Sequence, residues 1–136
     1  MKLKYSYVDG GFHPKLNRHT FHWKCEAFDG TEAPRYNRYI CGVLGAVAQG
    51  TGECDELLRF IQRVECGEEK KIVAGGNDVT LTFNQSGVQV DIQVNDDWVG
   101  QLEGHFTLQE WRIALEAWKR FLQMPESLDS MVEITL

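Results

Sequence analysis

Histidines and a cysteine gather near the N-terminus, and these are the side chains of the sequence best suited to catalysis or metal binding. His13, His19, His22 and Cys25 lie in one short segment, and imidazole nitrogens and thiolates are good zinc ligands. A strand over this segment would, however, point His22 and Cys25 to opposite faces. A fourth ligand, such as Cys41, would have to come from elsewhere. The spacing matches no zinc motif, and we expect neither a metal nor a cofactor.

The same histidines suit a second hypothesis, an enzyme that acts on nucleic acid. Two of them would serve as general acid and base, with Lys15 or Lys24 beside a phosphate. Nearby aromatic side chains could stack on bases, and these are Phe12, Phe21, Trp23, Tyr36 and Tyr39. The alternative is a half-buried sheet edge with mixed charges. No phosphate-binding glycine loop and no nucleophile elbow occurs anywhere in the chain.

Charge is distributed unevenly in this chain of 136 residues, whose net charge is -6. Residues 1–39 carry seven Lys/Arg and four Asp/Glu, a net +3, whereas the remainder carries seven and sixteen, a net -9. Between Lys71 and Arg112 there is no cation, while six acidic residues occur there. Such a stretch creates a negative field that attracts cationic partners and repels nucleic acid. The alternative is that acidity only keeps the protein in solution.

Polar residues in this cation-free stretch form the predicted partner-binding site. Amide and hydroxyl groups donate and accept hydrogen bonds, and carboxylates accept bidentate arginine. If the strands below are correct, most of these residues share one sheet face, with two acids in a turn at its rim. The predicted site consists of Asp78, Thr80, Thr82, Gln89, Asp91, Gln93, Asp96, Asp97, Gln101 and Glu103.

The elements that would position these residues follow from hydrophobic periodicity. Alternation predicts strands over 3–8 and 20–28, with a turn at Asp9-Gly10-Gly11. Spacings of three and four predict helices over 37–49 and 53–66. Alternation in 79–83, 88–94 and 98–102, separated by turns, predicts a three-stranded antiparallel meander.

A capping box at Thr107 begins the clearest helix, which Pro125 ends. Its apolar stripe, which includes Trp111, Leu115 and Trp118, is expected to pack on the meander, although a heptad-like stripe could instead form a dimer. The tail 131–136 would add an edge strand. We therefore predict one α+β domain over 1–136, with a mainly antiparallel sheet and two or three helices, the C-terminal one packed on the sheet.

Composition places the chain among ordinary globular domains, with 43% hydrophobic and 25% charged residues. The early lysines precede no apolar run, so we expect no secretory signal, and the longest apolar stretch, 39–48, is too short to cross a bilayer. The cysteines at 25, 41, 54 and 66 lack metal or disulfide spacing. They are interpreted as small, mostly buried thiols in a reducing cytoplasm.

The segment Gly104-His105-Phe106-Thr107-Leu108-Gln109-Glu110-Trp111, continuing to Trp118-Lys119-Arg120-Phe121-Leu122, resembles the closing helix of bacterial immunity proteins from contact-dependent growth-inhibition systems. The resemblance covers roughly the last third of the chain and consists of aromatic and leucine positions. It implies a cytoplasmic antitoxin without catalytic activity that binds a cognate protein toxin, expected to be a basic nuclease domain. Neither nucleic acid nor membrane would be a partner, and the protein would be a monomer or a weak homodimer. A nucleic-acid enzyme and a self-associating structural domain remain the alternatives.

Overall fold

The computed structural model describes residues 1–136 and shows an α+β fold with two antiparallel sheets. The first sheet has the order β2-β1-β7, formed by β1 (Lys2–His13), β2 (Arg18–Phe28) and β7 (Met131–Thr135). The second has the order β3-β4-β5-β6, formed by β3 (Lys71–Gly76), β4 (Val79–Asn84), β5 (Gly87–Ile92) and β6 (His105–Phe106). The predicted fold class is therefore confirmed, and the tail strand at the C-terminus is present.

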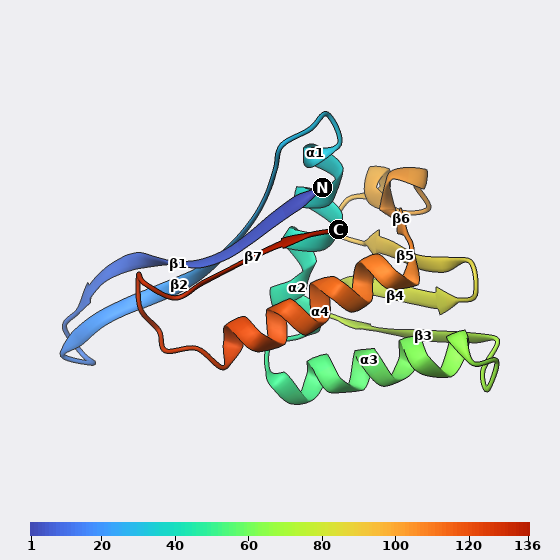
Figure 1. Ribbon diagram of the computed structural model, residues 1–136. Helices are drawn as coiled ribbons and strands as arrows, with labels where there is room; N and C mark the ends of the chain where they lie inside the picture. Colours follow the sequence, from blue (N-terminus) through green and yellow to red (C-terminus); the bar gives the residue numbers. More distant parts are fainter.

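The helices occupy the space beside and between the sheets. They are α1 (Ala33–Tyr36), the π-helix η1 (Asn37–Cys41), α2 (Gly42–Val47), α3 (Thr51–Glu65) and α4 (Leu108–Leu122), with two 3-10 turns, η2 (Asp96–Trp98) and η3 (Leu102–Gly104). Helices α3 and α4 lie side by side, and α4 also contacts β7, β1 and β5, so it links both sheets (Figure 1). None of these helices combines the length and the apolar character needed to cross a bilayer.

Helix α4 begins at the predicted capping box and carries the centre of the core. Thr107 Oγ1 accepts the backbone N–H of Glu110 at 2.9 Å, and Glu110 Oε1 accepts the backbone N–H of Thr107 at 3.0 Å. Trp118 is fully buried, and its indole N–H donates to the carbonyl of Ala48 at 2.8 Å. Trp111 and Leu115 are equally buried. The helix stripe is thus the protein's own core and offers no surface for self-association.

The first sheet extends beyond the rest of the molecule as a two-stranded arm, defined here as residues 7–23. Strand β7 pairs with β1 only along Lys2–Ser6, whereas β1 and β2 continue together to His13 and Arg18. The arm projects away from the helices on the side opposite the β6 region (Figure 1). Its base contacts the core where the Trp23 ring meets the Trp118 ring edge to face at 5.8 Å. A Cβ atom added to Gly45 of α2 would lie 2.9 Å from Trp23 Nε1, so this contact depends on a glycine.

The predicted turn at Asp9-Gly10-Gly11 is wrong, because the chain continues through it as part of β1. The pairing register shifts between Asp9 and Phe12, which marks a β-bulge, and Gly11 has a φ of 85°. The hairpin turns at residues 14–17 instead, where Asn17 adopts the left-handed conformation. A glycine pair inside alternating residues therefore indicates a bulge here rather than the end of a strand.

The prediction of a third meander strand over residues 98–102 is also wrong. This segment forms the 3-10 turns η2 and η3 with a left-handed Gly100 between them, and the short β6 pairs with β5 in its place. Conversely, β3 was not predicted, and it pairs along the whole of β4. The meander therefore exists, but its strands are β3, β4 and β5 with β6 at the edge.

The interpretation of all four cysteines as thiols is wrong for two of them. Cys25 on β2 and Cys41 on η1 form a disulfide bond that ties the base of the arm to the π-helix. Cys54 is a free buried thiol, and burial raises its pKa to about 11. Cys66 is free and exposed. The disulfide also removes Cys25 and Cys41 from the hypothetical zinc site.

Candidate functional site

The outer face of the second sheet brings together the core of the predicted binding site. The register places Thr80 opposite Asp91 and Thr82 opposite Gln89, so these four side chains share one face. Gln93 joins them, because its Nε2 donates to Thr80 Oγ1 at 2.7 Å. All but Gln93 are half-buried.

Three residues on this face were not predicted. Val73 lies opposite Thr82, Lys71 lies opposite Asn84, and His105 lies opposite Gln89. The face is therefore not free of cations, since β3 adds a lysine at one corner. Only the position of β3 could have revealed this.

Two residues of the predicted site support a neighbouring loop instead of facing a partner. We define the acidic loop as residues 93–104, which follow β5 and lead to β6. Asp91 accepts the backbone N–H of Gly100 at 2.7 Å, and Gln89 Nε2 donates to the carbonyl of Gln101 at 2.9 Å. Within the loop, Asn95 accepts the backbone N–H of Asp97 at 2.9 Å. The polar face is thus the platform on which the loop is fixed.

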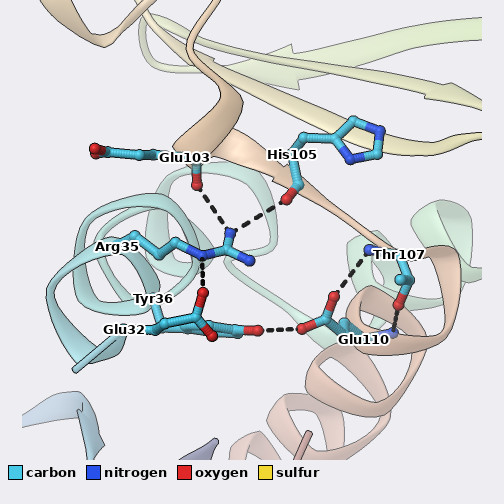
Figure 2. Close-up of polar contacts among 7 residues, drawn as sticks. All are labelled: Glu32, Arg35, Tyr36, Glu103, His105, Thr107 and Glu110. Atoms are coloured by element: carbon cyan, nitrogen blue, oxygen red, sulfur yellow. Dashed lines mark hydrogen bonds and ion pairs between the residues drawn. The ribbon is translucent and has the colours of Figure 1, made fainter. Parts of the chain in front are cut away.

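Helix α1 fixes the other end of the acidic loop through Arg35 (Figure 2). The Arg35 guanidinium donates from Nη1 to the carbonyls of Glu103 and His105 at 3.0 and 3.2 Å, and from Nε to Glu32 at 3.4 Å. It also lies over the Phe106 ring at 4.5 Å from the centroid. Nothing in the local sequence around Arg35 indicates this role, because its acceptors lie about seventy residues further along.

A buried tyrosine connects the same region to helix α4. The hydroxyl of Tyr36 donates to Glu110, whose other oxygen accepts the backbone N–H of Thr107 (Figure 2). Burial, together with this carboxylate, raises the pKa of Tyr36 to about 12. The residues that follow the loop are therefore anchored to α1 and α4 at once.

The acidic loop presents apolar side chains to solvent beside its carboxylates. Leu102 is 90% exposed, Val94 is 70% exposed and Val99 is 40% exposed. Asp96, Asp97 and Glu103 are also exposed. Apolar residues surrounded by charge are typical of the centre and rim of a protein–protein interface. Sequence reasoning missed the three apolar residues because a strand was expected at each of them.

None of the six acidic residues between Lys71 and Arg112 takes part in an ion pair. The ion pairs of the molecule lie on the first sheet, on α1 and around α3 and α4. Of the six, Asp91 and Glu110 accept internal hydrogen bonds. Asp78, Asp96, Asp97 and Glu103 remain exposed, with Asp78 in the β3–β4 turn. Four carboxylates are therefore free to meet cations of another molecule.

An open cleft of about 450 Å³ borders the acidic loop, and Arg38 and Trp98 are among its lining residues. The Arg38 guanidinium lies over the Trp98 ring at 4.6 Å from the centroid. Pro34, Asn37, Gly42 and Ile92 complete the lining.

The N-terminal histidines lie on the arm, and they do not converge on a cleft. His19 Nδ1 lies 3.5 Å from Asp9, and His13 Nδ1 accepts the backbone N–H of Leu16 at 3.3 Å. The backbone N–H of Gly11, and then His19, hold the pKa of Asp9 below its usual range. All three histidines are exposed. No group of three or more His, Cys, Asp or Glu side chains is arranged to hold a metal ion.

Comparison of the chain with protein-family models, curated proteins and solved structures finds no match. The candidate site is therefore supported only by the contacts and exposures described above.

Proposed function

We propose that this protein is an immunity protein that binds and neutralises a basic toxin, with the acidic loop as its binding surface. The observation that carries the proposal is the set of exposed, unpaired carboxylates at Asp96, Asp97 and Glu103 beside the exposed Leu102. Carboxylates without internal partners lose no ion pair when a cationic surface approaches. They therefore supply attraction at no cost in intramolecular contacts.

The resemblance of the C-terminal third to immunity proteins from contact-dependent growth-inhibition systems supports the same proposal. The toxin would be a nuclease domain whose basic active site is covered by the acidic loop. The antitoxin would act by occupying that site and would perform no chemistry itself.

Two assays test the proposal, protection of living cells and direct binding in vitro. Both use the toxin domain encoded by the gene next to that of this protein. Cells that express the domain should survive when this protein is co-expressed. Purified components should associate more slowly as salt rises from about 0.05 to 0.5 M, because the Debye length falls well below the approach distance.

Charge reversal provides a matched comparison. Glu103→Lys should slow association by up to about 10-fold, because this side chain is exposed and makes no internal contact. Glu116→Lys on the solvent face of α4 changes net charge equally and should have a smaller effect. Binding that ignores both salt and Glu103→Lys would argue against the acidic loop, and absence of protection by the wild-type protein would argue against the function.

The alternative of an enzyme acting on nucleic acid receives less support. Its histidines lie on both faces of an exposed arm, and His19 is already engaged with Asp9. Purified protein that cleaves RNA or DNA, and loses that activity with His13→Ala, His19→Ala or His22→Ala, would reverse this preference.

A further inference from the structure

Arg38 is an exposed cation beside an acidic surface, and the proposed function does not account for it. Its guanidinium takes part in none of the ion pairs, and the arginines that donate hydrogen bonds are Arg35, Arg63 and Arg112. Arg35, the other arginine beside the acidic loop, uses its donors on two backbone carbonyls and on a carboxylate. The N–H donors of Arg38 are therefore free to bind another molecule.

Trp98 supports this guanidinium from the side of the acidic loop. The central carbon of the Arg38 guanidinium lies 4.6 Å from the centroid of the Trp98 ring, an attractive arrangement of cation and aromatic face. The planar fork of an arginine loses little freedom when it forms hydrogen bonds, and it matches the two oxygens of a carboxylate. Arg38 is thus already placed to receive an anionic group.

The π-helix η1 creates the space beside Arg38. The backbone N–H of Gly42 donates to the carbonyl of Asn37, the bond that defines a π turn, and Gly42 lines the cleft. A Cβ atom added to Gly42 would lie 3.2 Å from that carbonyl oxygen, so a side chain is disfavoured there. Isolated π turns occur frequently at functional sites. The turn that carries Arg38 therefore also leaves room for a group of another molecule.

We propose that Arg38 binds the carboxylate of an acidic side chain of the toxin, which enters the cleft between basic neighbours. This proposal rests on the proposed function. Asp96 and Asp97 are exposed in the same 3-10 turn as Trp98, so a free anion such as phosphate would approach against their field. A carboxylate on a protein whose neighbouring cations meet the acidic loop is not repelled in this way.

Such a pairing would make Arg38 a specificity-determining residue. An acidic surface without a cation attracts any basic protein. Arg38 opposes a patch that is basic throughout and favours one that carries an acid at the matching position. Discrimination between partners generally includes an unfavourable contact with the wrong ones.

The variant Arg38→Glu tests the proposal through the sign of its effect. If overall charge alone governs binding, the more negative surface should bind the basic toxin more tightly. If Arg38 pairs with an acid, the new carboxylate should face that acid, and affinity should fall by about 10-fold or more. Calorimetric titration with the toxin domain at one fixed salt concentration measures the change.

Two further measurements separate this pairing from damage to the loop. Arg59→Glu changes the charge equally at an exposed arginine of α3, a helix that lies away from the acidic loop, and should not weaken toxin binding (Figure 1). A fluorescently labelled polylysine peptide reports the negative charge of an intact loop. The Arg38→Glu protein should bind this peptide more tightly than the wild-type protein does.

The possible results are distinct. Unchanged or tighter toxin binding by Arg38→Glu would overturn the proposal. Weaker binding of both toxin and polylysine would also overturn it, because Arg38 would then only support the loop. Binding of inorganic phosphate that Arg38→Glu abolishes would assign the cleft to a free anion instead. A wild-type protein that binds no toxin would refute the proposed function itself, and the role of Arg38 with it.

Discussion

The carboxylate of Asp91 accepts a hydrogen bond at 2.7 Å from the backbone N–H of Gly100, nine residues further along the chain. This bond joins the sheet to the acidic loop at the residue whose left-handed φ of 69° separates the two 3-10 turns. A side chain that looked like a partner-binding acid in the sequence therefore determines the shape of the surface beside it.

Asp91→Ala should loosen the acidic loop and lower the free energy of unfolding by about 1 kcal/mol, because one net hydrogen bond is lost. The amide of Gly100 should then exchange its hydrogen faster in NMR or mass-spectrometric measurements. Asp97→Ala is the matched control, since the Asp97 side chain makes no internal hydrogen bond or ion pair. Equal exchange in both variants would show that the carboxylate of Asp91 does not hold the loop.

Leu102→Asp should separate binding from folding. The side chain is 90% exposed, so the free energy of unfolding should change by less than about 0.5 kcal/mol. If Leu102 enters an apolar pocket of the toxin, affinity should fall by about 10-fold or more, corresponding to about 1.4 kcal/mol. Calorimetric titration measures the affinity, and Leu128→Asp, which is also exposed but distant in the chain, is the control. Unchanged affinity would remove Leu102 from the interface.

Trp118→Ala should lower the free energy of unfolding by about 3–5 kcal/mol, because it opens a cavity in the core and leaves the Ala48 carbonyl without its donor. Chemical denaturation gives the value. Glu116→Ala on the same helix is exposed and should change it by no more than about 0.5 kcal/mol. A cost below about 1 kcal/mol in an intact fold would contradict this packing.

Reduction of the Cys25–Cys41 bond should destabilise the protein by about 3 kcal/mol, the value expected for a closed loop of about this length. Thermal unfolding with and without dithiothreitol measures the difference. The double variant Cys25→Ser/Cys41→Ser should be insensitive to the reductant, while Cys66→Ser should remain sensitive. Identical melting of the wild-type protein under both conditions would mean that the bond adds no stability.

Stability should decline in the alkaline range because of Tyr36. Its pKa is raised from 10.0 to about 12 in the folded protein, so its contribution is complete below pH 10 and is lost as pH rises toward 12. Over that window the unfolded chain loses the phenolic proton before the folded chain does. Tyr36→Phe should therefore show a smaller fall in unfolding free energy between pH 10 and 12.

Removing the negative charge of Glu110, the hydrogen-bond partner of Tyr36, should change the pH at which Tyr36 ionises. Glu110→Gln should shift the Tyr36 titration, followed by tyrosinate absorbance, to lower pH, because the carboxylate no longer opposes ionisation. A titration that does not move would assign the raised pKa to burial alone.

Hydrophobic periodicity correctly predicted the helices and strands whose formation depends on their own residues rather than on contacts with distant ones. The stripe through Trp111, Leu115 and Trp118 and the capping box at Thr107 were sufficient for α4, and alternation was sufficient for β4 and β5. Each of these segments buries one face, so the spacing of its apolar residues directly reflects which side chains are buried.

Elements that depend on distant residues were missed or misplaced. Residues 98–102 alternate like a strand, but Asp91 and Gln89 draw that segment into turns. Strand β3 contains two glycines and begins with a lysine, so it lacks a strong local signal. The same reasoning applies to the disulfide and to Arg35, since only the folded chain brings their partners near. The acidic character of the site could be predicted, but its exposed leucine and its supporting arginine could not.

The contact between Gly45 and Trp23 restricts which residue can stand at position 45. A single carbon added there would lie 2.9 Å from Trp23 Nε1, so the indole would have to shift and its edge-to-face contact with Trp118 would change. The packing at the base of the arm, beside the Cys25–Cys41 bond, therefore requires a residue without a side chain at position 45.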